Sequence, residues 1–328
     1  MEFRIIPPPD LSKEIAFYEK WLEIGYNGEM EYLKRGLERR RRTFPEWVKS
    51  ILVVRASYND INWDGVEVEG KVMISKYAIR MDYHRVLKTR IAEILSELES
   101  KHKGIAYKIF VDSSPVLEKP IAKNAGFGFI GYNTLLLDPE RGSYFNLGGA
   151  FLNVDLSDSI GNIDTTLCLG CNLCVESCPT KAIVEPGVLD ASKCISYLTV
   201  EYKGVIPKDL AVRMQSWVFG CDVCQEVCPL NKKAKLTEVY SPYKKELVAP
   251  SVEYLLSLDE EGFRRLFDNT PVLRTGYARF LRNVIVAAFN LGYYNLLYNM
   301  YKSGKLQKER LWILQLKELG VLNEHREY

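Results

Sequence analysis

Eight cysteines lie between positions 168 and 228 of this 328-residue chain, and their spacing is its strongest chemical signal. Four fall in LCLGCNLCVESCP (167–179), spaced C-x2-C-x2-C-x3-C with a proline directly after. A second stretch, FGCDVCQEVCPLN (219–231), repeats C-x2-C-x3-C-P, and Cys194 stands alone between the two. In a reducing compartment, cysteines at such spacing are metal ligands rather than disulfides.

Two 4Fe–4S clusters explain this spacing better than zinc does. Pairs of the form C-x2-C also build tetrahedral zinc sites, so zinc is the alternative. A third cysteine followed by C-P is typical of bacterial ferredoxins, in which the fourth cysteine of each run ligates the other cluster. We therefore predict one cluster on Cys168, Cys171, Cys174 and Cys228, and a second on Cys178, Cys194, Cys221 and Cys224.

Length and composition indicate what surrounds these cysteines. The chain is 47% apolar and 26% charged, which is typical of a globular protein. A ferredoxin needs little more than the cysteine region, so the remaining residues predict a second site that the clusters serve. We find no secretory signal and no apolar run long enough to span a bilayer, so we expect a cytoplasmic protein without a membrane partner. The formal net charge of +2 favours no class of partner.

The elements that must position this site fall into three regions. Apolar periodicity predicts helices over 11–25 and 83–101, and β-rich runs predict strands over 50–57, 107–114 and 134–138. Alternating strands and helices are typical of an α/β domain, and the pattern after about 251 is helical throughout. We predict an α/β domain over 1–160, a ferredoxin-like domain over 161–240 and an all-α, HEAT-like region over 241–328.

One carboxylate stands out in the α/β region. Asp112 ends the predicted strand YKIFVDSS, and a carboxylate there often faces the crevice in which α/β sheets bind ligands. A cap for the following segment is the alternative role. The glycines of NAGFGFIGYNT (124–134) do not form a dinucleotide fingerprint, and a tight turn explains them better.

Several stretches together resemble epoxyqueuosine reductases, which act in the last step of queuosine biosynthesis in transfer RNA. The resemblance covers roughly 30–292, and its most specific parts are the two C-P runs and CISYLT (194–199). Cobalamin-dependent reductive dehalogenases are wider relatives. The other matching stretches are MEYLKRGLERR (30–40), DYH (82–84), VDSSPVLEKPIAKNAGFGFIGYNTLLLD (111–138), GSYFNLG (142–148) and RTGYARFLRNVIVAAFNLG (274–292).

The resemblance implies an oxidoreductase that holds cobalamin between the α/β and ferredoxin-like domains. Asp112 aligns with the proton donor of the family, and we expect burial beside IFV (109–111) to raise its pKa. His84 is better explained by packing or hydrogen bonding at a helix start than as a cobalt ligand. The implied cobalamin contacts are Arg40, Asp112, Leu136, Ser196, Asp222 and Val223.

The resemblance also implies that the substrate is an epoxyqueuosine base at the wobble position of a tRNA anticodon loop. Such a loop needs cations near its phosphates. The predicted tRNA contacts are Lys203, Gly204, Arg279 and Arg282. We further expect a monomer that takes electrons from an external low-potential donor. The alternatives are a dehalogenase-like reductase of a small molecule and a plain electron-transfer ferredoxin.

Overall fold

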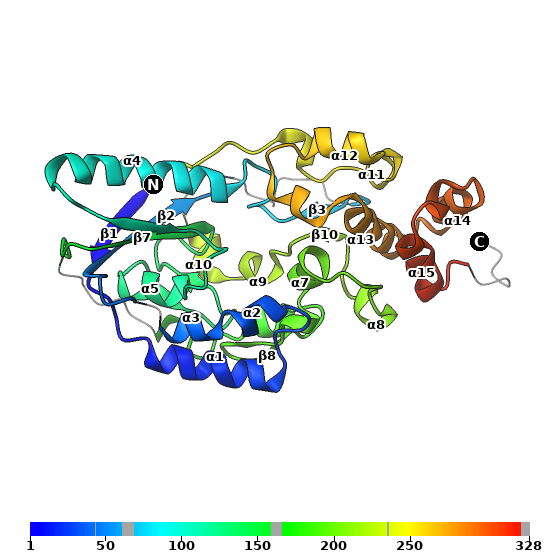
Figure 1. Cartoon of the computed structure of the whole chain (residues 1–328). Coiled ribbons are helices and arrows are strands. Elements are labelled where there is room, and N and C mark those ends of the chain that lie inside the picture. Colours follow the sequence, from blue (N-terminus) through cyan, green and yellow to red (C-terminus); the bar gives the residue numbers. More distant parts are fainter. Residues whose placement is uncertain (43, 61–68, 159–165, 235, 323–328) are drawn as a thin grey trace.

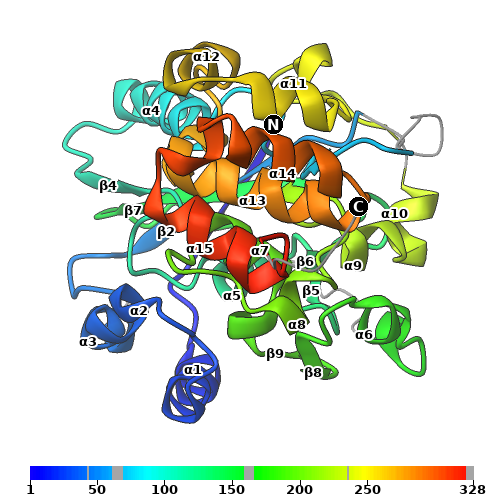
Figure 2. The same cartoon turned by 90° about the vertical axis from the view of Figure 1, so that its right-hand side faces the viewer.

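The computed structural model describes residues 1–42, 44–60, 69–158, 166–234 and 236–322. A sheet-containing part lies at one end of the molecule and a helical part, with the C-terminus, at the other (Figure 1). Cysteines lie within or next to the short helices α6, α7 and α9, and α7 and α9 lie between these two ends (Figures 1 and 2). The cysteines are therefore placed where both ends can contribute to one site.

The main sheet has four antiparallel strands in the order β1-β2-β7-β4. Its centre is formed by the long pairing of β2 with β7, which runs from Ser50 opposite Leu152 to Ser57 opposite Phe145. The strands are β1 (Glu2–Ile6), β2 (Ser50–Ser57), β4 (Tyr107–Phe110) and β7 (Phe145–Leu152).

Helices cover both faces of this sheet. Alternate residues of β2 face opposite sides, so Leu52 and Val54 join one apolar core while Ile51 and Val53 join the other. The helix α4 (Tyr83–Lys101) covers the first face, and α5 (Glu118–Asn124) covers the second. On the second side, α1 (Ser12–Ile24), α2 (Glu31–Arg35) and α3 (Leu37–Arg41) add an outer layer (Figure 1).

The central strand β7 was not predicted, and the predicted strand over 134–138 is wrong in extent. Only Leu136–Leu137 is a strand (β6), and it pairs with β5 (Phe129–Ile130) outside the main sheet. β7 is FNLGGAFL, whose two glycines lower its β propensity. A Cβ on Gly149 would lie 2.2 Å from the backbone oxygen of Leu52, so close packing inside the sheet requires glycine there.

The cysteine region consists of short helices and two small ribbons. A parallel pair joins β10 to β3 (Met73–Ile74), so a segment of the predicted first domain packs with the cysteine region. The elements are α6 (Leu173–Ser177), β8 (Ile183–Glu185), β9 (Val188–Leu189), α7 (Ile195–Val200), α8 (Lys208–Ala211), β10 (Trp217–Phe219), α9 (Val223–Glu226) and α10 (Pro229–Lys233).

Helices form the last part of the chain around a largely buried α13 (Tyr277–Asn290). This helix packs against β10 and α15, so it joins the cysteine region to the C-terminal helices. One apolar core includes residues of β3, β10, α7, α11 and α13. The other helices are α11 (Val252–Ser257), α12 (Glu260–Leu266), α14 (Tyr294–Lys302) and α15 (Arg310–Leu319). No helix of the described residues is long and apolar enough to cross a membrane.

Candidate active site

The cysteines predicted for the first cluster lie near one another. Burial raises the pKa of Cys168, and Cys228 and Cys171 lie close enough to it for thiolate charge on them to raise that pKa further. Burial, Cys168 and Cys228 act in the same way on the pKa of Cys174. Cys174 lies within α6, while Cys228 directly precedes α10. The contacts between α6 and α9 bring these two chain segments together. A cysteine far along the chain thus comes to the first run, as the predicted exchange of fourth ligands requires.

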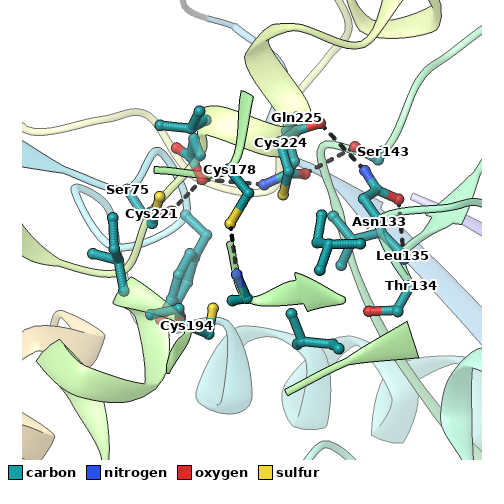
Figure 3. Close-up of a pocket in the computed structure, with 18 of the residues that line it drawn as sticks. Ser75, Asn133, Thr134, Leu135, Ser143, Cys178, Cys194, Cys221, Cys224 and Gln225 are labelled. Atoms are coloured by element: carbon teal, nitrogen blue, oxygen red, sulfur yellow. Dashed lines mark hydrogen bonds between the residues drawn. The ribbon is translucent and has the colours of Figure 1, made fainter. Parts of the chain in front are cut away.

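The cysteines of the second set line one cavity. Cys194 neighbours Cys178, and Cys221 neighbours both Cys224 and Cys194. In Figure 3, the sulfurs of Cys178, Cys194, Cys221 and Cys224 lie around the same cavity. Cys174 of the first set is a further charged neighbour of Cys224, so the two sets adjoin. No three of the described ligand-type side chains converge as they would on a single metal ion.

Backbone amides are directed at the sulfurs of the second set. The amide of Ala182 donates to Cys178 Sγ at 3.2 Å. Burial raises the pKa of Cys194, and hydrogen bonds from the backbone amides of Tyr197 and Ser196 lower it in part. Such amide–sulfur bonds stabilise negative charge on sulfur and tune the potential of a cluster.

A cavity of about 360 Å³ adjoins the second set of cysteines. Four of the six predicted cobalamin contacts line its walls, namely Leu136, Ser196, Asp222 and Val223. Its lining combines apolar side chains with hydroxyl and amide groups, as Figure 3 shows for Ser75, Thr134 and Asn133. The structure therefore brings these four residues together, although they come from distant parts of the chain.

The carboxylate of Asp222 is satisfied inside the protein. It is fully buried and accepts hydrogen bonds from Ser75 Oγ at 2.6 Å, the Lys76 amide at 2.7 Å and Gln225 Nε2 at 3.1 Å. Burial raises its pKa, and these bonds oppose the rise. These contacts fix α9 against the segment 75–76, so Asp222 shapes the cavity wall.

Asp112 lies in a cluster of charged groups at the end of β4. Its Oδ2 is 3.0 Å from His84 Nε2 and 3.7 Å from the guanidinium of Arg274. His84 Nδ1 is in turn 2.7 Å from Asp82 Oδ1, so the imidazole bridges two carboxylates. The backbone of Asp112 has φ 50°, a left-handed conformation that is uncommon outside glycine. Strained backbone of this kind is frequent at functional sites.

The expected rise in the pKa of Asp112 is wrong. Its side chain is 46% exposed. Desolvation still raises its pKa, but the hydrogen bond from His84 and the charges of His84 and Arg274 hold it below its usual range. For His84, desolvation lowers the pKa, yet the bonds to Asp112 and Asp82 raise it to about 9. At neutral pH the proton of this pair therefore resides on His84.

Glu118 is a second proton-holding group beside Asp112. Its Oε1 accepts a hydrogen bond from the Asp112 amide at 2.5 Å. Burial, followed by the charge of Asp112, raises the pKa of Glu118 to about 8. Glu118 was not predicted from the sequence, and its place in the first turn of α5 gives no local signal of a proton-holding role, since a glutamate there is ordinarily explained by the helix dipole.

Asp82, His84, Asp112, Glu118 and Arg274 together form what we call the acid cluster. This cluster adjoins the cavity through Tyr77. This tyrosine lines the cavity and lies near both Asp112 and Asp222, whose charges act on its hydroxyl. Its ring also packs edge-on against Tyr83, 6.1 Å away. Lys119, another wall residue that we did not select, donates to the Thr134 carbonyl at 2.7 Å. Tyr77 thus connects the charged groups around Asp112 to the wall of the cavity.

Arg40 does not reach this cavity. It is buried, with its guanidinium over the ring of Tyr18 at 5.2 Å and in contact with the Leu33 carbonyl at 3.4 Å. Its contacts hold α3 against α1 and the end of α2. Arg40 is not among the residues that line the cavity, and its predicted role at cobalamin stays a prediction.

The predicted surface role of Arg282 is wrong. Arg282 is fully buried and donates to the carbonyls of Leu198, Tyr202 and Gly204 at 2.7, 3.0 and 2.7 Å. Its side chain therefore holds the segment that carries Lys203, and it cannot contact a phosphate directly. The sequence alone does not distinguish a buried arginine from an exposed one on an apolar helix.

Arg279 is also occupied by the protein itself. It donates to the carbonyls of Thr275, Arg274 and Val200 at 2.6, 2.9 and 3.2 Å. Lys203 is exposed and Gly204 half-buried, so the two residues of the loop that follows α7 remain candidates for contact with a ligand.

Comparison with known proteins gives the family of this chain. A family model described as "4Fe-4S double cluster binding domain" matches residues 167–231, and "Epoxyqueuosine reductase QueG, DUF1730" matches 39–113. The curated epoxyqueuosine reductase of Escherichia coli K12 is 36% identical over 296 residues, or 87% of this chain and 76% of that protein. That of Cyclobacterium marinum is 38% identical over 282 residues, or 84% and 88%.

Solved structures agree on the fold. Epoxyqueuosine reductase from Streptococcus thermophilus matches with a TM-score of 0.84 at 24% identity, covering 97% of this chain and 86% of that one. An epoxyqueuosine reductase solved with an epoxyqueuosine-modified tRNA-Tyr stem loop matches with a TM-score of 0.82 at 24% identity, covering 98% and 94%. The predicted double-cluster iron–sulfur domain is confirmed.

Proposed function

This chain belongs to the epoxyqueuosine reductase family, and we propose that it reduces epoxyqueuosine to queuosine at the wobble position of a tRNA anticodon, drawing electrons through two 4Fe–4S clusters and cobalamin. The reaction replaces an epoxide by an alkene. It consumes two electrons and two protons and releases the oxygen as water. The protein must therefore supply a route for electrons and a source of two protons.

The electron route is supported by the two sets of cysteines. Cys168, Cys171, Cys174 and Cys228 would hold the outer cluster, and Cys178, Cys194, Cys221 and Cys224 would hold the inner one. The inner set borders the cavity, whereas Leu169 beside the outer set is 70% exposed. An external low-potential donor would thus deliver electrons at the outer cluster, and the inner cluster would pass them to the cavity.

The cavity lining fits cobalamin, whose ring is largely apolar and whose edge carries amides. Leu136 and Val223 would contact the ring, Ser196 and Ser75 its polar edge, and Asp222 would keep the wall in place through its internal hydrogen bonds. Bound cobalamin would supply a low-valent cobalt, a strong nucleophile and electron donor that no side chain can replace.

The acid cluster would supply the protons. At neutral pH, His84 holds a proton on Nε2, 3.0 Å from Asp112 Oδ2, and Glu118 holds one beside the Asp112 amide. Asp112 would pass protons to the substrate oxygen, once as the epoxide C–O bond opens and once as the hydroxyl leaves as water. Two groups that are protonated at neutral pH match the two protons that the reaction requires.

Substrate access would lie over Asp112. Tyr32 of α2 lies close enough to Glu201, Asp112 and Arg274 for their charges to act on its hydroxyl. The helix α2 and the segment after α7 therefore meet at the acid cluster. Arg282 would order the loop that presents Lys203 and Gly204, which we propose as tRNA contacts. An unstacked anticodon nucleotide can enter such a site, as bases of single-stranded loops do in RNA recognition.

The observation that carries this proposal is the convergence on one cavity of the inner cysteines, four predicted cofactor contacts and the neighbouring Asp112–His84 pair. The test is turnover. Protein reconstituted with iron, sulfide and cobalamin under anaerobic conditions should convert an epoxyqueuosine-containing stem loop to queuosine with a low-potential reductant. Reduction of a halogenated small molecule without activity on this RNA would contradict it.

A further inference from the structure

A second pocket, separate from the cavity beside the cysteines, lies between α3, the segment that follows it and β4. Its volume is about 500 Å³, within the range of small-ligand sites. Arg39, Arg42 and Lys108 line it together with apolar side chains that include Phe110 and Phe151. We refer to this site as the cation pocket.

The three cations of the cation pocket have no charged or hydrogen-bonding side-chain partner within the part of the chain that the structure describes. Among the described residues, Arg39, Arg42 and Lys108 make no ion pair and no side-chain hydrogen bond, and all three are exposed. Glu38 also borders the pocket, but Arg41 forms an ion pair with it. Many surface arginines elsewhere are paired with a glutamate, such as Arg264 with Glu260. Three unpaired cations around one pocket favour an anionic ligand.

The lining indicates which anion would fit. Arginine binds phosphate through two parallel N–H donors, and lysine adds a point charge. Phe110 and Phe151, whose ring centroids are 4.9 Å apart, form the apolar floor of the pocket but are only 2% and 5% exposed, so the accessible lining is mainly the three cations. Such a lining would recognise the backbone phosphate of a nucleotide.

The position of the pocket connects it to the acid cluster. Ser114 and Pro115 line the pocket, and Asp112 comes only two residues before Ser114. On the other side, α2 carries Tyr32 close to Asp112, and only Gly36 separates α2 from α3. Figures 1 and 2 place α2 and α3 next to each other on the outside of the sheet domain. An RNA strand that passes over Asp112 would therefore reach the cation pocket with its neighbouring nucleotides.

We propose that the cation pocket binds a nucleotide of the substrate RNA next to the one that enters the active site, with its phosphate on Arg39, Arg42 and Lys108. This proposal rests on the proposed function for the identity of the RNA. It assigns to the N-terminal domain an RNA contact that complements the loop carrying Lys203.

The test compares two double variants that remove equal charge. R42Q/K108Q alters the cation pocket, whereas K101Q/K103Q removes two exposed lysines at the end of α4, on the other face of the sheet. Affinity for an unmodified anticodon stem loop is measured by fluorescence anisotropy at several salt concentrations. We expect R42Q/K108Q to weaken binding about tenfold and to reduce the log–log salt slope by about 0.7, the contribution of one single-strand phosphate contact. K101Q/K103Q should match the wild type.

Equal losses in both double variants, or no loss in R42Q/K108Q, would overturn the proposal. Binding of AMP is measured as well, because a free nucleotide carries the same phosphate group as RNA. If AMP binds the wild type but not R42Q/K108Q, and RNA affinity is unchanged in that variant, the pocket takes a free nucleotide and not RNA. Turnover by the wild type is measured separately, so failure of the reductase assignment is distinguishable from failure of the pocket.

Discussion

The substitution Asp82→Asn removes a negative charge that raises the pKa of His84 and leaves the hydrogen-bond acceptor in place. Asp82 caps α4 by accepting from the His84 amide at 3.0 Å, and it also accepts from His84 Nδ1 at 2.7 Å. Asparagine retains an acceptor oxygen and is an equally good N-cap, so the helix should remain intact. What the variant loses is one of the two negative charges that act on the imidazole.

The size of the effect follows from the pKa of His84. Desolvation lowers that pKa, and the bonds to Asp112 and then Asp82 raise it from 6.5 to about 9. Two carboxylates share this rise, and asparagine can keep the hydrogen bond while losing the charge, so removing the Asp82 charge should lower the pKa by about 1, equivalent to about 1.4 kcal/mol. At pH 8 the protonated fraction of His84 would fall from about nine-tenths to about one-half.

The assay is the single-turnover rate of the reconstituted enzyme as a function of pH. Because their raised pKa values keep Glu118 and His84 protonated at and below neutral pH, the wild-type rate should hold there and fall as pH rises, first through about 8 as Glu118 loses its proton and then through about 9 as His84 does. In Asp82→Asn the fall that belongs to His84 should move about one pH unit lower, with the rate at pH 6.5 nearly unchanged. Glu97→Gln, which removes an exposed carboxylate from the same helix, is the matched control. An alkaline limb at the same pH in all three proteins would refute His84 as the proton source.

Two further predictions concern the clusters and the buried arginine. Cys194→Ala should leave roughly half of about eight irons per chain after anaerobic reconstitution, because no other cysteine can replace this ligand; two zinc ions and no iron in the wild type would contradict the assignment. Arg282→Gln should destabilise the protein by about 3 kcal/mol or more, since it strands buried carbonyls, and a shift in the denaturation midpoint measures this. Arg264→Gln, at an exposed ion pair, should change stability by less than about 1 kcal/mol, and an equal effect in both variants would refute a special role for Arg282.

The iron–sulfur region could be predicted from the sequence because its ligands are chemically distinctive and closely spaced. The long helix over 83–101 and the strand over 50–57 were predictable for different reasons, since the helix carries a regular apolar repeat and the strand is a β-rich apolar run. The strand β7 was not predictable in this way. Its Gly148 and Gly149 serve close packing against β2 and Phe110, and that requirement exists only in the assembled sheet.

The roles of individual charged residues depended on burial, which local sequence does not reveal. Arg282 has the composition of a surface cation but lies at the centre of the packing around α13. Asp112 was selected as a strand-end carboxylate facing a ligand crevice, and its catalytic role stays a prediction, whereas the expected rise in its pKa was wrong. That pKa depends on His84 and Arg274, which lie 28 positions before it and 162 positions after it in the chain.

The most direct test of the central claim is a paired measurement on Asp112→Asn. Asparagine keeps the size and hydrogen-bonding capacity of the side chain but cannot relay a proton from His84. Cobalamin content, iron content and the single-turnover rate on epoxyqueuosine-containing stem loop are measured on the same preparation. We predict full cofactor content with a rate lowered by about a hundredfold or more. Full cofactor content with a near-normal rate would contradict proton delivery through Asp112.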